Sequence, residues 1–313
     1  MDGGDAVSIP DIEPGEAVLV DWPADRYFAS AALSRSELWL LHKDPPRYHA
    51  IVVERSMSWP ESKDMKLGTL IHLAVLEPAL FMSTVRVRPD QPSRPRPKKS
   101  RDQMASERAF GIARPSEWGA YDEAIESLKS FEAAGGTVLS LAQATLITGI
   151  AQAVKTHHYA ADLLELPGAN EQTILWREPD TGILCRVRLD SLRELGEARV
   201  IADLKSTRDP EPEAFGRSIA KLGYDFQAAF YTDAVQALFP GREIIYAIIA
   251  AGKDRPLKVS AAPLATSAIE DGRRMYRAAL ADLVKRRQTN NWRELWQDDR
   301  DLVFDKPKWA YPK

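Results

Sequence analysis

Apolar and polar residues alternate most regularly in the second half of the chain. Within 183–190 every second residue is apolar, and a strand would place these on one face. The opposite face would then carry Arg186, Arg188 and Asp190. A Pro-Asp-Thr-Gly turn at 179–182 precedes this segment. The same reasoning predicts strands over 173–177, 183–190, 200–205, 244–250 and 257–260.

Helical signals dominate the first half and return between and after the strands. Ser34 and Ser36 are candidate N-caps for a short helix that reaches Leu41. Pro78 ends a second helix, and Gly223 is a candidate break in a long one. The predicted helices cover 34–41, 63–77, 117–133, 140–165, 211–239 and 264–288. The sequence therefore predicts an α+β fold, with a helical N-terminal half and a small mixed sheet flanked by helices.

Changes in composition along the chain suggest its organisation. We expect an irregular N-terminal arm over 1–32, a single domain over 33–288 and a tail over 289–313 that is rich in Trp and charge. A basic, Pro-rich loop is inserted at 86–118, and too many prolines occur in it for a regular helix. A solvated loop and a strap that follows a phosphate backbone both remain open for it.

Overall composition limits the possible classes of protein. The 313 residues include 42 Lys and Arg against 45 Asp and Glu, a net charge of −3, so a uniformly basic nucleic-acid coat is excluded but a local basic channel is not. The single cysteine, Cys185, excludes an intrachain disulfide and any iron–sulfur cluster held by the thiolates of one chain. With eight residues in its longest apolar run, 244–251, the chain is expected to be cytoplasmic and to have no membrane partner.

Charged residues on two of the predicted strands form a candidate reaction centre. Asp203 and Lys205 share a strand face, and Asp190 joins them if the two strands are neighbours. Two carboxylates and an ammonium suit a hard divalent cation and a hydrolytic water. An Asp-x-Lys pair taken alone is more often explained by a surface ion pair than by a reaction centre. Signatures of a P-loop and of a nucleophile elbow are absent from the sequence.

The spacing of these residues resembles a known nuclease family. Asp190 followed by Asp203-Leu204-Lys205 resembles the core of the PD-(D/E)xK nucleases, although Leu189 stands where the family name has proline. Gln227 and Tyr231 resemble the QxxxY motif of the RecB-type branch, and their i,i+4 spacing places them on one helix face.

Two upstream segments make the resemblance to one branch of the family more specific. Gly68 and His72 are similar to the Gly-x-x-x-His motif of that branch. The segment from Leu33 to Pro46 resembles the opening helix of the nuclease domain of exodeoxyribonuclease VIII (RecE), and the similarity extends over about 33–235.

The resemblance implies a set of roles for individual residues. His72, Asp190 and Asp203 would bind the metal ion, with the backbone carbonyl of Leu204 as a further ligand. Lys205 would position the attacking water and complete a catalytic set with Asp190 and Asp203. The cofactor would be Mg²⁺, with Mn²⁺ as a substitute and no iron–sulfur cluster. Gln227 and Tyr231 would contact the DNA backbone, and we add Arg186 and Arg188 to this DNA-binding set.

The resemblance also implies an activity and partners. The chain would be a metal-dependent exonuclease that degrades linear double-stranded DNA from its ends, 5′→3′, leaving 3′ single strands for phage-type recombination. Its partners would be double-stranded DNA ends, a single-strand annealing protein and further copies of itself. A catalytically silent scaffold that binds DNA ends, and an endonuclease of the same fold, are the alternatives.

Several charged and imidazole groups allow more than one interpretation. His72 could be an ordinary core histidine, and Arg186 and Arg188 could pair with acids on neighbouring strands instead of clamping phosphate. Glu171 could support the site or bind the metal directly. His157 and His158 are expected to be structural residues in the middle of a helix.

Overall fold

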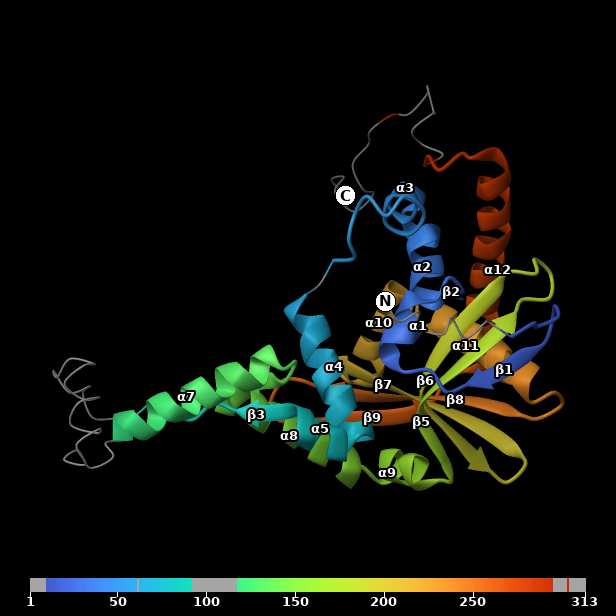
Figure 1. Cartoon of the computed structure of the whole chain (residues 1–313). Helices are drawn as coiled ribbons and strands as arrows, with labels where there is room; N and C mark the ends of the chain where they lie inside the picture. Colours follow the sequence, from blue (N-terminus) through green and yellow to red (C-terminus); the bar gives the residue numbers. More distant parts are fainter. Residues whose placement is uncertain (1–9, 61, 92–116, 295–302, 304–313) are drawn as a thin grey trace, which may run out of the picture.

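The computed structural model of the chain describes residues 10–60, 62–91, 117–294 and 303. A mixed sheet lies at its centre, with strand order β1-β5-β6-β7-β8-β9, and β2 pairs with β6 outside this path (Figure 1). Most neighbours are antiparallel, whereas β7–β8 and β2–β6 are parallel pairs. The strands are β1 (Ala17–Val20), β2 (Leu33–Ser34), β5 (Gly168–Arg177), β6 (Leu184–Leu195), β7 (Ala198–Thr207), β8 (Ile244–Gly252) and β9 (Val259–Pro263).

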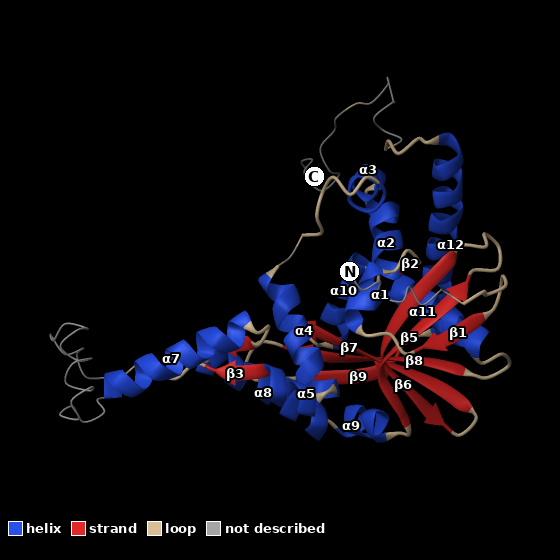
Figure 2. Cartoon of the chain, viewed as in Figure 1, coloured by secondary structure: helices blue, strands red, loops and turns tan. Residues whose placement is uncertain are grey.

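Helices cover both faces of this sheet (Figure 2). One face packs against α2 (Arg35–Lys43), α10 (Pro212–Leu222), α11 (Tyr224–Leu238) and α12 (Thr266–Thr289). The other packs against α4 (Lys63–Leu76), α5 (Pro78–Thr84), α8 (Leu141–Thr156) and α9 (His158–Glu165). Shorter helical segments are α1 (Ala24–Ala29), α3 (Pro45–Tyr48) and the π-helical turn η1 (His49–Val53).

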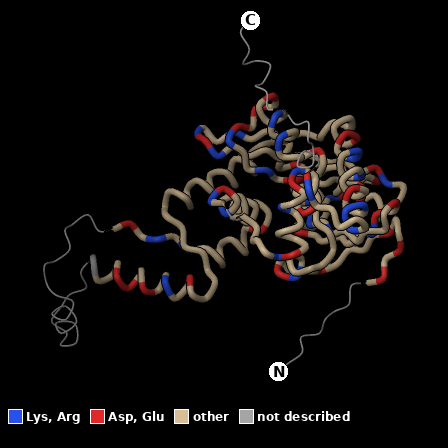
Figure 3. Tube along the Cα trace, turned by 90° about the horizontal axis from the view of Figure 1, so that it is seen from above, with Lys and Arg blue, Asp and Glu red and all other residues tan. Residues whose placement is uncertain are grey.

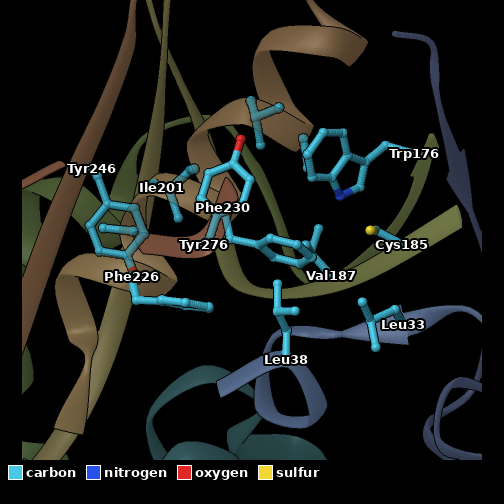
Figure 4. Packing of buried hydrophobic residues seen from close by; sticks show 14 of the residues in the cluster. Leu33, Leu38, Trp176, Cys185, Val187, Ile201, Phe226, Phe230, Tyr246 and Tyr276 are labelled. Carbon is cyan, nitrogen blue, oxygen red and sulfur yellow. The ribbon is translucent and has the colours of Figure 1, made fainter. Parts of the chain in front are cut away.

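Aromatic side chains fill the larger core, between the sheet and α11 and α12. Phe230 of α11 meets the rings of Trp176 and Tyr276 edge-on, with centroids 5.4 and 5.5 Å away (Figure 4). Such edge-to-face contacts add to the stabilisation that burial of the rings provides. The core fixes α11 against the sheet, and α11 carries Gln227 and Tyr231. No helix in the described part of the chain is long and apolar enough to cross a membrane.

Most helix and strand predictions are confirmed, and two local features explain the helix ends. Ser34 caps α2 in a reciprocal capping box with Glu37. Gly223 takes a left-handed conformation, φ 66°, and separates α10 from α11 as expected. The single helix predicted over 140–165 is wrong, because the chain breaks at His157. Its side chain accepts a hydrogen bond from the Ala160 N–H and caps α9, so it does not lie within a helix.

The irregular arm expected over 1–32 is also wrong for its described part. β1 pairs antiparallel with β5, from Ala17 opposite Trp176 to Val20 opposite Thr173. Ile12 and Trp22 are buried in a small cluster against this edge of the sheet. The segment is ordered by these distant contacts, because four strand residues alone carry little structural preference.

A separate unit projects from the helix layer beside α4 and α5. β3 (Val85–Val87) pairs with β4 (Thr137–Leu139), and α7 (Glu117–Ala133) extends outward from them (Figure 1). Acidic residues are spread along α7, which has a single lysine (Figure 3). The predicted loop over 86–118 thus begins inside a strand and ends inside a helix. Its middle, 92–116, and most of the predicted tail lie outside the described residues.

Candidate functional site

Strands β6 and β7 separate at the predicted acids. They pair from Leu195 opposite Ala198 to Leu192 opposite Ile201, and the ladder does not continue to Asp190. There the Asp190 carboxylate accepts a hydrogen bond of 2.8 Å from the backbone N–H of Leu204. A side chain thus replaces a strand carbonyl as the acceptor, and the opening between the strands is lined by carboxylates.

Helix α4 brings His72 to this opening. A Cβ atom added at Gly68 would lie 3.4 Å from the Ser206 hydroxyl oxygen, so α4 approaches β7 closely at this residue. One helical turn later, His72 Nδ1 lies 3.4 Å from Asp190 Oδ2. Burial disfavours the imidazolium, but the adjacent Asp190 charge outweighs it and raises the pKa of His72. The four-residue spacing therefore places Gly68 and His72 on the same face of α4, towards β7 and Asp190.

Asp203 and Lys205 form the second part of the site, on β7. Lys205 Nζ lies 2.5 Å from Asp203 Oδ2, and Gln227 Nε2 donates a hydrogen bond of 2.8 Å to Oδ1. Asp203 is only 1% exposed, and its Oδ2 is a buried oxygen to which no described group donates a well-directed hydrogen bond. Such an oxygen is costly unless a further cation compensates it.

The pKa values of the two aspartates are shifted in opposite directions. Burial raises the pKa of Asp203 and outweighs the Lys205 charge. Burial also opposes ionisation of Asp190, but the charges of His72 and Lys205 and the Leu204 N–H prevail, so its pKa is lowered. For Lys205, the carboxylates overcome the effect of burial and raise the pKa. The surroundings therefore favour the ionised form of Asp190 and disfavour the ionised form of Asp203.

Glu171, for which the sequence left two roles open, lies in a cluster with His72 and Asp190. It lies on β5 between Asn170, opposite Ser191, and Gln172, opposite Leu189, so it faces the Asp190 position. Its backbone has a φ of 55°, and its carboxylate accepts a hydrogen bond of 2.8 Å from Arg188 Nε. Burial raises its pKa. Ligand atoms of His72, Glu171 and Asp190 all lie within 4.8 Å of one another.

These donors fit a divalent metal ion. Carboxylate oxygens and one imidazole are ligands that Mg²⁺ or Mn²⁺ accepts. The buried Asp203 Oδ2 beside them, which accepts no well-directed hydrogen bond from a described group, is a second reason for the fit. The structure thus brings together His72 and Asp190 of the predicted ligand set and adds Glu171. Asp203 lies beside this cluster at the opening between β6 and β7. Ligation by the Leu204 carbonyl stays a prediction.

The predicted DNA-binding residues are in different environments. Gln227 is 8% exposed and already holds Asp203, whereas Tyr231, one turn further along α11, is half-buried. Arg186 is 4% exposed and donates to Glu37 and to the Ser30 carbonyl.

Arg188 is the less buried of the two arginines. Besides Glu171, it donates to the Trp22 carbonyl. For both arginines, pairing with acids is the interpretation that this arrangement favours. Contact of either side chain with DNA stays a prediction.

Comparisons with known proteins agree with this geometry. No protein with a curated description matches the sequence. The fold is similar to the crystal structure of a protein from Eubacterium rectale described provisionally as an exonuclease. The TM-score is 0.54 at 11% identity, and the match covers 92% of this chain and 96% of that one. The central sheet flanked by helices is thus the fold expected for PD-(D/E)xK nucleases. Residues 36–295 match the family model described as a PDDEXK-like domain of unknown function (DUF3799), and the chain belongs to this family.

Proposed function

We propose that the chain is a Mg²⁺-dependent exodeoxyribonuclease that degrades linear double-stranded DNA from its ends. The observation that carries this proposal is the convergence of His72, Glu171 and Asp190 at the opening between β6 and β7, with the Asp203–Lys205 pair beside them. Membership in a PDDEXK-like family and the fold of the Eubacterium rectale protein support a nuclease.

The residues of the site would divide the work of phosphodiester hydrolysis. A bound divalent ion would supply positive charge that polarises the phosphate. His72, Glu171, Asp190 and Asp203 would hold the ion. Lys205 would orient the water whose oxygen forms the new bond to phosphorus, while one P–O ester bond breaks and the leaving oxygen takes up a proton. Gln227 keeps Asp203 in place through its hydrogen bond to Oδ1.

The finer features of the proposal come from the RecE-type resemblance. They are 5′→3′ polarity, 3′ single-stranded products, assembly of several copies around the duplex and a single-strand annealing protein as partner in phage-type recombination. Mn²⁺ would substitute for Mg²⁺.

One experiment tests activity, polarity and dependence on ends together. Purified protein is incubated with linear duplex labelled at the 5′ or the 3′ end, beside an intact circle, with Mg²⁺, with Mn²⁺ and with EDTA. We expect early release of the 5′ label with either metal, none with EDTA, and an intact circle. Cleavage of the circle would indicate an endonuclease, and metal-independent binding without loss of label would indicate a scaffold.

Variants assign that activity to the site. Lys205→Ala and Asp203→Asn should abolish release of label. Arg274→Gln is the matched control, because this exposed side chain pairs with Asp271 on the outer helix α12. Full Mg²⁺-dependent activity in either site variant would contradict the assignment.

A further inference from the structure

Helix α2 carries two cations and one aromatic ring on the same face. Among the described residues, neither cation forms an ion pair with a carboxylate. Arg35, Trp39 and Lys43 follow one another at four-residue intervals, which places them along one face of the helix. The Arg35 guanidinium lies 5.3 Å and the Lys43 ammonium 4.5 Å from the centre of the Trp39 ring. We call these three residues the α2 stripe. The Cα atoms of Arg35 and Lys43 are about 12 Å apart along the helix axis, and their two charged groups converge on the Trp39 ring.

Carboxylates on α2 do not neutralise this stripe. Glu37 accepts hydrogen bonds from the Ser34 N–H and from Arg186, and Asp44 accepts from the Arg47 N–H. By contrast, most arginines elsewhere on the sheet and on α12 pair with an acid, as Arg188 does with Glu171. Among the described residues, the stripe is therefore a site of positive charge without an ion-pair partner, on a chain whose net charge is negative.

The stripe begins beside the candidate metal site. Arg35 donates hydrogen bonds to the carbonyls of Leu222 and Gly223, at the break between α10 and α11. The next residue, Tyr224, has its ring centre 5.2 Å from Lys205 Nζ. Arg35 Nε is buried and has no hydrogen-bond partner among the described residues. Positively charged side chains thus extend from Lys205 in the site, past Arg35, to Lys43 on α2.

Close packing fixes the stripe relative to the site. A Cβ atom at Gly223 would lie only 2.5 Å from the Trp39 ring, and Trp39 meets Phe226 edge-on at 5.2 Å. Phe226 precedes Gln227, which holds Asp203. The stripe and the acids therefore share one rigid support, and both cationic groups lie against the Trp39 ring.

We propose that the α2 stripe binds the phosphate backbone of the DNA strand that enters the metal site, with Arg35 nearest to the reacting phosphate and Lys43 further along the strand. The ligand follows from the chemistry, because two cations that have no carboxylate partner in the described part of the chain, packed on one aromatic ring, suit the phosphates of a single strand. This inference rests on the proposed function and adds to it the path of the strand.

Binding of a fluorescein-labelled single-stranded oligonucleotide in EDTA tests the stripe without cleavage. Fluorescence anisotropy is measured over a range of salt concentrations for the wild type, Arg35→Gln, Lys43→Gln and the double variant. Each phosphate contact to a single strand contributes about 0.7 to the slope of log K against log salt, so the double variant should lose about 1.4. At 0.1 M salt this corresponds to about 25-fold weaker binding, and about fivefold for Lys43→Gln alone.

The control is Arg274→Gln combined with Lys129→Gln, which removes two exposed cations that already pair with acids on their own helices. Its slope should equal that of the wild type. The exposed Lys43 keeps the test valid if Arg35→Gln fails to fold, as judged by circular dichroism. An unchanged slope in Lys43→Gln, or an equal loss in the control, would overturn the proposal. Digestion of linear duplex is scored separately, so a protein that binds through α2 but never cleaves would refute only the nuclease function.

Discussion

The hydrogen bond from Gln227 to Asp203 allows a quantitative test of how the buried site is held together. Gln227→Met preserves the length of the side chain but removes the amide that donates to Asp203 Oδ1 over 2.8 Å. The variant leaves a carboxylate that is 1% exposed and whose ion-pair partner is Lys205, without the amide that donates to Oδ1. A buried hydrogen bond to a charged group contributes about 1.5–3 kcal/mol, so we expect the free energy of unfolding to fall by about 2 kcal/mol.

Urea unfolding at pH 7.5 in EDTA measures this loss, and a double-mutant cycle with Asp203→Ala isolates the pair. In the Asp203→Ala background Gln227 has lost its partner, so adding Gln227→Met should cost little. A coupling energy below about 0.5 kcal/mol, the usual additivity error, would refute the assignment of Gln227 as the residue that holds Asp203.

Three further predictions concern the metal cluster, the approach of α4 and the buried arginine. Affinity for Mg²⁺, measured by calorimetry, should fall as the pH is lowered from 7.5 to 5.5. The pKa values of His72 and Glu171 are raised, so protons compete with the ion above the ordinary titration ranges of both groups. Gly68→Leu should displace α4 from Ser206 and abolish Mg²⁺ binding while circular dichroism stays unchanged. Arg186→Met should lower the free energy of unfolding by about 3–5 kcal/mol, because it leaves Glu37 without its buried partner.

Each of these has an outcome that contradicts it. Equal Mg²⁺ affinity at both pH values would mean that other groups bind the ion. Wild-type affinity in Gly68→Leu would show that the close approach of α4 is unnecessary, with Gly216→Leu as the control because a Cβ there meets nothing within 4 Å. If Arg186→Met lowers the free energy of unfolding by less than 1 kcal/mol, the Arg186 guanidinium of the wild type is solvated and its pair with Glu37 is not buried.

Local patterns in the sequence were sufficient for much of the fold. Alternation along β6 separated the apolar Cys185 and Val187 from Asp190, and Gly223 marked the break between α10 and α11. These predictions succeeded because each depends on neighbouring residues and on backbone preferences that operate over a few positions.

Features that depend on contacts between distant residues could not be predicted from local sequence patterns. β1 forms because it pairs with β5, which lies more than 150 residues later in the sequence. Arg186 is separated by 149 residues from Glu37, and no local pattern links the two. Glu171 is placed opposite Asp190 by the register of β5 and β6, and that register is decided by long-range packing.

The N-terminal strand also affects how the protein behaves at high concentration. β1 covers residues Thr173–Trp176 of β5, which is ten residues long and would otherwise form one edge of the sheet. An uncovered strand of this kind presents unpaired backbone groups that recruit strands from other molecules. Shortening the chain past Val20 would therefore expose a surface for self-association on the flank of the sheet formed by β5.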